Sequence, residues 1–207
     1  MRRVCIVGVA GPSNRRANYL ESGVELWAMN LCHRFLTVKA DRWFQLHPRN
    51  WRADEWGPGN EDYEREAVSA FGRPPDHLEF LKNCGIPVYM QEKNADIPTS
   101  VRYPLGEIAS RFRPYFTSTI PYMIALALHE DVDEIGLLGI YLTSTEEYSA
   151  HRPCVEYWLG VARGMGVEVV LPDDCDLTRA PLYTYSETTT STEGLTLTSV
   201  EAVEVVA

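Results

Sequence analysis

The sequence lacks any long hydrophobic run. No apolar stretch reaches the roughly 18 residues that a membrane-spanning helix needs, and no signal peptide is visible. We therefore expect a cytoplasmic chain without a membrane span. Cysteine is also sparse: the five cysteines are odd in number, scattered and never spaced as Cys-x-x-Cys. This pattern argues against a disulfide framework and a zinc site and predicts reduced thiols.

Basic residues are in deficit as well. Lys and Arg number 19 against 29 Asp and Glu, which leaves a net charge of -10. An acidic chain is repelled by phosphate-rich surfaces, so we expect no nonspecific binding to nucleic acid or anionic membranes. A local pocket around one phosphate stays compatible with this charge. Hydrophobic residues make up 45% of the 207 residues and aromatic residues 11%, which is enough for one globular domain with a sizeable core.

Short apolar runs alternate with helical patterns along the chain. The strands that we expect lie at 4–7, 25–29, 41–46, 86–90, 134–140 and 167–171. The expected helices lie at 14–20, 61–71, 76–84, 117–129 and 153–164, and residues 91–102 look irregular. This alternation predicts a single-domain, Rossmann-like α/β fold over residues 1–186, with a mostly parallel sheet and helices on both faces. The Thr- and Ser-rich tail 187–207 is either an added edge strand, in this chain or a neighbour, or disordered.

The first strand runs directly into a glycine-rich turn, Gly8-Val9-Ala10-Gly11-Pro12-Ser13. Glycine permits close approaches that a Cβ would block, and Ser13 or Asn14 could cap the helix that follows. Free N–H groups at such a turn can bind an anion. We expect a phosphate-bearing ligand here, with Gly8, Gly11 and Ser13 as its contacts; the alternative is a tight turn without a ligand.

Other polar residues follow the predicted strands, where ligands of parallel sheets bind. Asn30 could read a base or ribose edge, or serve only as a turn residue, and His47 is either a ligand contact or a turn histidine. Thr117, Ser118 and Thr119 place three hydroxyls at a helix N-terminus, and one cap explains only one of them. Tyr148 and His151 lie in a polar loop, where they are either solvated or catalytic.

An acidic triplet, Asp131-Val132-Asp133, is similar to the metal-binding motif of some glycosyltransferases. It precedes a predicted strand, however, on the side of the sheet away from ligands. We therefore interpret it as a solvated connector. No acidic cluster follows the predicted strands, so we expect no metal site.

Three blocks of the sequence resemble the bacterial sialyltransferases of glycosyltransferase family 42. They also resemble a wider Rossmann-like group that includes the 6-hydroxymethylpterin diphosphokinase-like proteins, and uncharacterised proteins of tailed bacteriophages. The blocks are the strand and glycine turn at 7–13, the two strand ends within 26–48, and the ordered motifs of 116–177. The resemblance covers about 150 residues and is patchy between 50 and 115.

The resemblance implies a metal-independent transferase that needs no cofactor and uses a cytidine-nucleotide sugar as donor substrate. It implies that Gly11 and Ser13 hold the phosphate and that Asn30, Thr117 and Ser118 contact the donor. Tyr148 would then lie against the leaving phosphate, and His151 would be the general base. Three departures stand out. Val9-Ala10 replaces an asparagine of the turn, Tyr141 stands where the family has an acidic residue, and the lid between Tyr148 and His151 is missing.

Two further hypotheses stay open. One is a diphosphokinase acting on a pterin-like alcohol, which would need ATP and a divalent metal. The other is a non-catalytic Rossmann-like binding or structural subunit, such as a phage component located in the host cytoplasm. In that case the tail could form a homo-oligomer by strand addition, and the region of Trp43, Trp51 and Trp56 could be an interface.

Overall fold

A computed structural model describes residues 1–47, 77–143 and 147–179, with the backbone alone at Glu147 and Tyr148. The described strands form one sheet in the order β5-β4-β3-β2-β1-β6-β7, and every adjacent pair is parallel. The strands are β1 (Arg3–Val7), β2 (Val24–Met29), β3 (Arg42–Phe44), β4 (Val88–Met90), β5 (Ser100–Arg102), β6 (Glu134–Leu138) and β7 (Glu168–Val170). The predicted α/β, Rossmann-like class with a parallel sheet is therefore confirmed.

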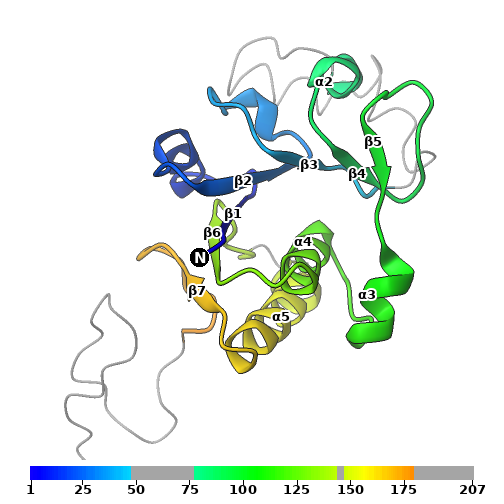
Figure 1. The fold of residues 1–207 in the computed structure, drawn as a ribbon. Coiled ribbons are helices and arrows are strands. Elements are labelled where there is room, and N and C mark those ends of the chain that lie inside the picture. The colour runs from blue at the N-terminus through cyan, green and yellow to red at the C-terminus, as the bar shows by residue number, and fades with distance from the viewer. Residues whose placement is uncertain (48–76, 144–146, 180–207) are drawn as a thin grey trace, which may run out of the picture.

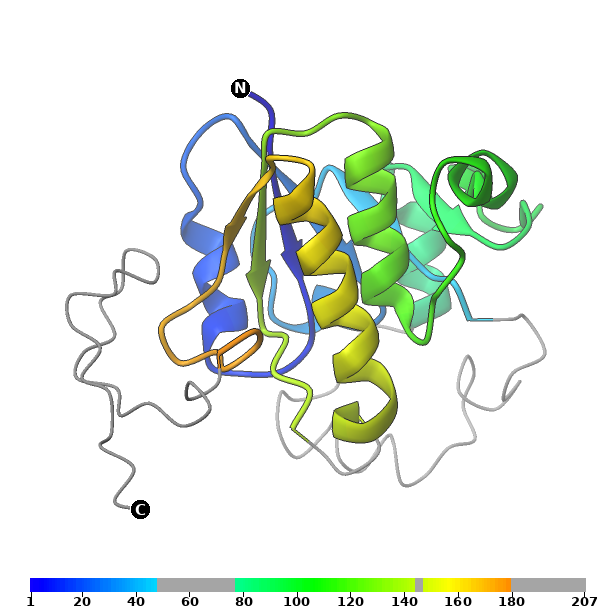
Figure 2. The same cartoon turned by 90° about the horizontal axis from the view of Figure 1, so that it is seen from below.

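Helical segments cover both faces of the sheet (Figures 1 and 2). On one face α4 and α5 lie side by side, and α2 lies with the short helices η1 and η2 on the other. The α-helices are α2 (His77–Asn83), α3 (Leu105–Arg111), α4 (Thr119–His129) and α5 (Arg152–Gly164). The 3-10 helices are η1 (Ser13–Tyr19) and η2 (Cys32–Arg34), and η3 (Glu147–His151) is a π-helical turn.

The strongest sequence patterns form the middle of the molecule. β1 is buried from Val4 to Val7, as expected for a strand that is covered on both faces. The all-round apolar helix α4 buries nine of its eleven residues, which agrees with its predicted central position. Trp27, Trp43 and Trp158 are fully buried and make the core strongly aromatic, so Trp43 does not belong to an exposed interface as the sequence allowed.

Several predicted elements need correction. The stretch 91–102 is not wholly irregular, because it contains β5, and α3 was not predicted. The segment after the glycine turn is a 3-10 helix rather than an α-helix. The strand expected at 134–140 ends at Leu138. The helix predicted at 61–71, the loop with Trp51 and Trp56, and the tail 187–207 lie outside the described residues.

The topology determines where a ligand can bind. From β1 the chain runs outward through β2 to β5, and then returns to place β6 on the other side of β1. The chain leaves β1 for η1 on one face of the sheet and leaves β6 for α5 on the other (Figure 2), so the carboxyl ends of these two strands form the switch point at which parallel sheets bind ligands. The region around Asp131 lies before β6, at the amino ends of the strands. Asp131 is exposed there and pairs with Arg111, as expected for a solvated connector.

A network of charged side chains joins the elements at the amino ends of the strands. The carboxylate of Glu130 accepts hydrogen bonds from Arg42 at 2.6 and 2.8 Å and from Arg2 at 2.6 Å. Arg2 also pairs with Glu25 at 2.7 Å. Burial acts to raise the pKa of Glu130, but the hydrogen bonds from Arg42 and Arg2 outweigh it and hold that pKa below its usual value. The network ties β1, β2, β3 and the end of α4 together.

Candidate functional site

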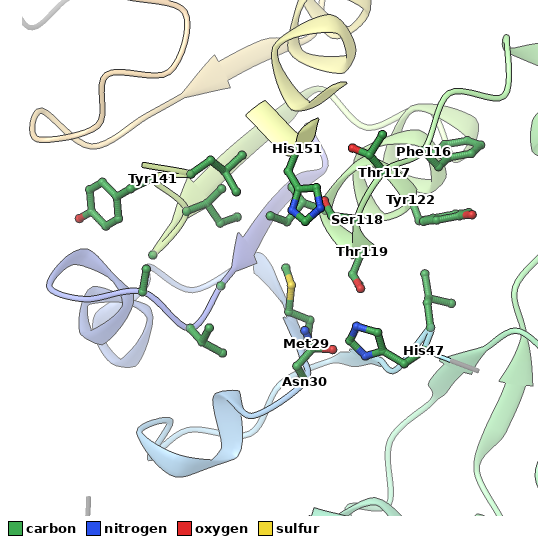
Figure 3. Close-up of a pocket in the computed structure, with 18 of the residues that line it drawn as sticks. Met29, Asn30, His47, Phe116, Thr117, Ser118, Thr119, Tyr122, Tyr141 and His151 are labelled. Carbon is green, nitrogen blue, oxygen red and sulfur yellow. The ribbon is translucent and has the colours of Figure 1, made fainter. Parts of the chain in front are cut away.

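A cavity of about 810 Å3 opens at the carboxyl ends of β1 and β6, where the strand order reverses (Figure 3). Segments that are far apart in the sequence form its walls. They are the loop after β1 with Gly8–Gly11, Met29 and Asn30 at the end of β2, Leu46 and His47 after β3, residues 116–120 and Tyr122 at the start of α4, residues 139–143 after β6, and His151. Its size is in the range of small-molecule sites.

Two glycines bring the loops after β1 and β6 into direct contact. A Cβ on Gly8 would lie 2.5 Å from the carbonyl oxygen of Gly139, and Gly139 itself has a φ of +64°. A Cβ on Gly139 would lie 2.6 Å from the oxygens of Gly8 and Ala10. Neither position can therefore carry a side chain without movement of the backbone. At Gly11 a Cβ would meet nothing within 4 Å, so this part of the loop borders open space.

The expectation that the glycine turn offers free N–H groups needs correction. The N–H of Gly8 donates to the carbonyl of Leu138 at 2.8 Å, and the N–H of Ala10 donates to that of Gly139 at 3.1 Å. These two donors hold the loop against β6 and are not available to an anion. The η1 helix begins after Pro12 without a side-chain cap.

Ser13 lies beside the cavity, not in its lining, and its predicted capping role is wrong. Its hydroxyl accepts a hydrogen bond from the N–H of Gly139 at 2.9 Å and lies 2.9 Å from the hydroxyl of Tyr141. The residue is 1% exposed. The side chain of Asn14 does not cap either, because its amide donates to the carbonyl of Val9. The contact of Ser13 with a ligand phosphate stays a prediction.

Asn30 lies at the end of β2 in a left-handed conformation, with φ 47°. Its N–H donates to the carbonyl of Phe44 at 3.1 Å. Its side-chain oxygen is buried and has no hydrogen-bond partner within the described part of the chain. A buried acceptor without a partner costs about 1–3 kcal/mol, so a ligand donor at this position would be stabilising.

Thr117, Ser118 and Thr119 line the cavity at the N-terminus of α4. Ser118 occupies the N-cap position in an extended conformation, but its hydroxyl makes no capping hydrogen bond, contrary to expectation. This oxygen is buried and, like that of Asn30, has no partner among residues 1–47, 77–143 and 147–179. Two buried polar atoms in one cavity thus lack partners, and the dipole of α4 favours a negative group beside Ser118.

His151 ends the π-helical turn η3 and immediately precedes α5. Figure 3 shows its imidazole entering the cavity from the wall opposite His47. His151 therefore shares one cavity with Gly8, Gly11, Asn30, Thr117 and Ser118. Tyr148 belongs to the same turn, and the position of its side chain lies outside the described part of the structure.

His47 is the residue for which the sequence left both interpretations open. It lines the cavity, and its Nδ1 lies 3.2 Å from the side-chain nitrogen of the buried Gln45. The oxygen of Gln45 lies 2.9 Å from Nε2 of His77. Burial, followed by the nearby charges of His33, Arg34 and His47, lowers the pKa of His77 to about 3. His77 is therefore neutral near pH 7 and supports a hydrogen-bonded chain that ends at the cavity.

The described lining of the cavity contains no Lys, Arg, Asp or Glu. The ionisable side chains of its two histidines face one another across it, and Tyr122 and Tyr141 complete the titratable groups. No group of three or more His, Cys, Asp or Glu side chains is placed to hold a metal ion in the described ranges. All five cysteines are free thiols, and burial raises the pKa of Cys32, whose thiol donates to the carbonyl of Val7, to about 12. The site is therefore built from hydroxyls, amides, backbone groups and imidazoles.

Sequence reasoning missed several of the lining residues, and three of them shape the site. Gly139 was included in a strand, whereas its positive φ ends β6. The rings of Phe116 and Tyr122 stack on one wall with their centroids 4.2 Å apart (Figure 3), and nothing in the spacing of these residues pointed to the cavity.

Among the described residues no helix is both long and apolar enough to cross a membrane.

Comparisons with known proteins support the fold. No family model matches the sequence, and no curated protein matches it. Among solved structures, the apo α-2,3-sialyltransferase from Campylobacter jejuni is similar with a TM-score of 0.50 and 16% identity, over 88% of this chain and 80% of that one. The sialyltransferase CstII from Campylobacter jejuni, in complex with cytidine-5'-monophosphate, gives 0.47 and 14% over 85% and 81%. Thiamine pyrophosphokinase from Bacillus subtilis gives 0.44 and 13%, over 83% of this chain and 61% of that one. At these identities the likeness to the α-2,3-sialyltransferase is one of fold.

Proposed function

We propose that this chain is a nucleotide-binding transferase that takes a CMP-sugar or a related nucleoside-monophosphate donor in the β1/β6 cavity. One observation carries the proposal. Six of the residues that the sequence singled out at separate strand and helix ends line this cavity, namely Gly8, Gly11, Asn30, Thr117, Ser118 and His151. The sequence blocks that resemble family 42 sialyltransferases contain the same residues.

The chemistry of the lining favours a ligand of low charge. A monophosphate can be held by the hydroxyls of Thr117 and Ser118 and by the N-terminus of α4. A triphosphate is normally bound with magnesium, which prefers carboxylate ligands, and with basic side chains. The described lining supplies neither. This difference ranks the diphosphokinase alternative below the glycosyl transfer.

In the proposed reaction His151 acts as the general base. Its imidazole accepts the proton of an acceptor hydroxyl while the hydroxyl oxygen attacks the anomeric carbon of the donor sugar. The bond from that carbon to the phosphate oxygen breaks, and CMP leaves with the bonding electron pair. The sugar carbon is inverted because attack and departure occur on opposite sides. The negative charge that develops on the phosphate faces the hydroxyls at the N-terminus of α4. Tyr148 is proposed as an additional contact of the leaving phosphate.

A calorimetric titration tests the binding step. CMP should bind saturably without added metal, and more tightly than CTP. The same titration with UMP and AMP, which differ from CMP in the base, then defines the base selectivity of the site. Absence of saturable binding for every nucleotide, with and without magnesium, would contradict the proposal and favour a non-catalytic scaffold.

The catalytic step has its own test. His151→Ala should abolish transfer from a CMP-sugar and leave the affinity for CMP nearly intact. His129→Ala is the matched control, because His129 lies at the C-terminal end of α4, whereas the cavity lies at the N-terminal end of this helix. Loss of folding in His151→Ala, measured by circular dichroism, would instead assign a structural role to this residue.

A further inference from the structure

The loop after β7 contacts both walls of the cavity without lining it. Figure 2 shows this loop beside the turn that follows β1. Its residues alternate between two environments: Cys175 and Leu177 are fully buried, whereas Asp174 and Asp176 direct their carboxylates to polar partners. Cys175 and Leu177 anchor the loop to the core, and the carboxylates of Asp174 and Asp176 each bind a residue of one cavity wall.

Asp174 holds the wall that is formed by the loop after β1. Its carboxylate accepts a hydrogen bond from the hydroxyl of Tyr141 at 2.8 Å. The same hydroxyl accepts the N–H of Ser13 at 3.2 Å and lies 2.9 Å from Ser13 Oγ, which in turn binds the N–H of Gly139. In Figure 3 the ring of Tyr141 points away from His151. This tyrosine therefore joins three loops instead of reaching the centre of the cavity.

Asp176 holds the opposite wall. Arg152 directly follows His151 and begins α5, and it is 8% exposed. Its guanidinium donates to Asp176 Oδ1 at 3.0 Å and to the carbonyl of Asp176 at 2.7 Å. Glu156 accepts from Arg152 Nε at 2.9 Å and from the N–H of Thr178 at 3.0 Å. The start of α5, and with it the backbone of His151, is thereby fixed to the same loop.

We propose that the loop from Asp173 to Arg179 is a brace that sets the distance between the glycine turn and His151. Asp174, acting through Tyr141, positions the turn, and Asp176, acting through Arg152, positions His151. Hydrogen bonds to charged groups are stronger than neutral ones, so both ends of the brace are firm. The three residues Tyr141, Asp174 and Asp176 are positioning residues: Asp174 and Asp176 lie outside the lining, and Tyr141 borders the cavity with its ring directed away from His151 (Figure 3). The consequence for nucleotide binding rests on the proposed function, whereas the brace itself does not.

Amide hydrogen exchange by NMR, without ligand, tests the brace directly. Tyr141→Phe removes one hydroxyl and should speed the exchange of the Ser13 amide by about tenfold, since a hydrogen bond contributes about 0.5–1.5 kcal/mol and 1.4 kcal/mol equals a factor of ten. Asp174→Asn keeps an acceptor oxygen and should have a smaller effect. Thr178→Ala is the control: it removes the hydroxyl that Arg163 contacts on the same loop and keeps the backbone N–H that donates to Glu156.

A positioning role is separated from a general loss of stability by a second NMR readout: a substitution at one wall of the cavity should shift the resonances of a residue at the other wall. Tyr141→Phe should shift the ring resonances of His151, and Asp176→Asn should shift the amide resonance of Ser13. Each variant should also weaken CMP binding by about threefold to tenfold, at a thermal midpoint close to that of Thr178→Ala. Unchanged Ser13 exchange in Tyr141→Phe, or no shift at the far wall in either variant, would overturn the brace. Wild-type protein that binds no CMP but shows both effects would refute the proposed function and leave the brace standing.

Discussion

Gly139→Ala probes the contact on which the shape of the cavity depends. Gly139 has φ +64°, and an added Cβ would lie 2.6 Å from Ala10 O, from Asn14 Cβ and from Gly8 O. Gly85 has the same φ of +64°, but its nearest atom would be 4.0 Å from the Cβ. The two positions therefore share the backbone strain of a left-handed alanine, and only Gly139 adds a steric conflict.

The expected magnitudes follow from these two terms. Left-handed strain costs roughly 1–2 kcal/mol, and overpacking costs typically about 1–3 kcal/mol. We expect Gly85→Ala to lower the free energy of unfolding by the first amount alone, and Gly139→Ala by about 2–5 kcal/mol. The second value is a large part of the ~5–15 kcal/mol that stabilises a typical domain. Any folded Gly139→Ala protein should also bind CMP less tightly, because the turn after β1 is pushed away from β6.

Urea denaturation of the two variants, followed by circular dichroism, measures the difference. The reasoning predicts that Gly139→Ala unfolds at a clearly lower urea concentration than Gly85→Ala, with similar slopes. Equal loss of stability in the two variants would refute the claim that the two loops need a glycine-to-glycine contact.

Three further predictions concern single side chains. Ser118→Ala should leave the free energy of unfolding unchanged or raise it slightly, since the buried hydroxyl has no partner in the described structure, while CMP affinity in calorimetry falls. Glu130 has a lowered pKa in the folded state, so its contribution is present above the unfolded value near 4.5 and is lost as the pH falls below it; Glu130→Gln should flatten the stability profile in that acid range. His77 has a folded pKa of about 3 against an ordinary 6.5, so unfolding takes up a proton between these values and stability falls as the pH drops through this window. His77→Phe should remove that fall.

Each of these predictions has a clear contrary result. A Ser118→Ala protein that is strongly destabilised would show that the hydroxyl supports the fold. Glu21→Gln is the control for Glu130, because the carboxylate of Glu21 is 81% exposed, and equal changes in both variants would contradict the role of the charge network. For His77, a pH profile between 6.5 and 3 that does not change on substitution would contradict its neutral state in the folded protein.

The parts of the fold that sequence predicts are those in which burial alone decides the structure. β1 and α4 are apolar along almost their whole length and are covered on several sides, so their residues show this locally, whereas β6 alternates between buried and half-buried positions. β5 is only Ser-Val-Arg and gains its partner from β4, so no pattern within it indicates a strand. The segment after Pro12 carries helical signals, yet Ser13 and Asn14 are drawn into contacts with Gly139 and Val9, and a 3-10 helix results.

The candidate site was predictable to the extent that parallel topology gathers strand ends. Asn30, Thr117, Ser118 and His151 follow from that rule. The contacts that hold the walls do not, because the hydroxyl of Tyr141 finds Ser13 across 128 positions of the sequence. Such pairs depend on which loops become neighbours, and that information exists only in the folded chain.

The most direct test of the central claim is a titration of the wild-type protein with CMP, in which two-dimensional amide NMR spectra are recorded at each CMP concentration. We predict saturable shifts concentrated at the glycine turn from Gly8 to Gly11, at Asn30, and at the start of α4 around Ser118. Saturable shifts confined to other surfaces, or spectra that do not change up to millimolar CMP, would contradict a nucleotide site between β1 and β6.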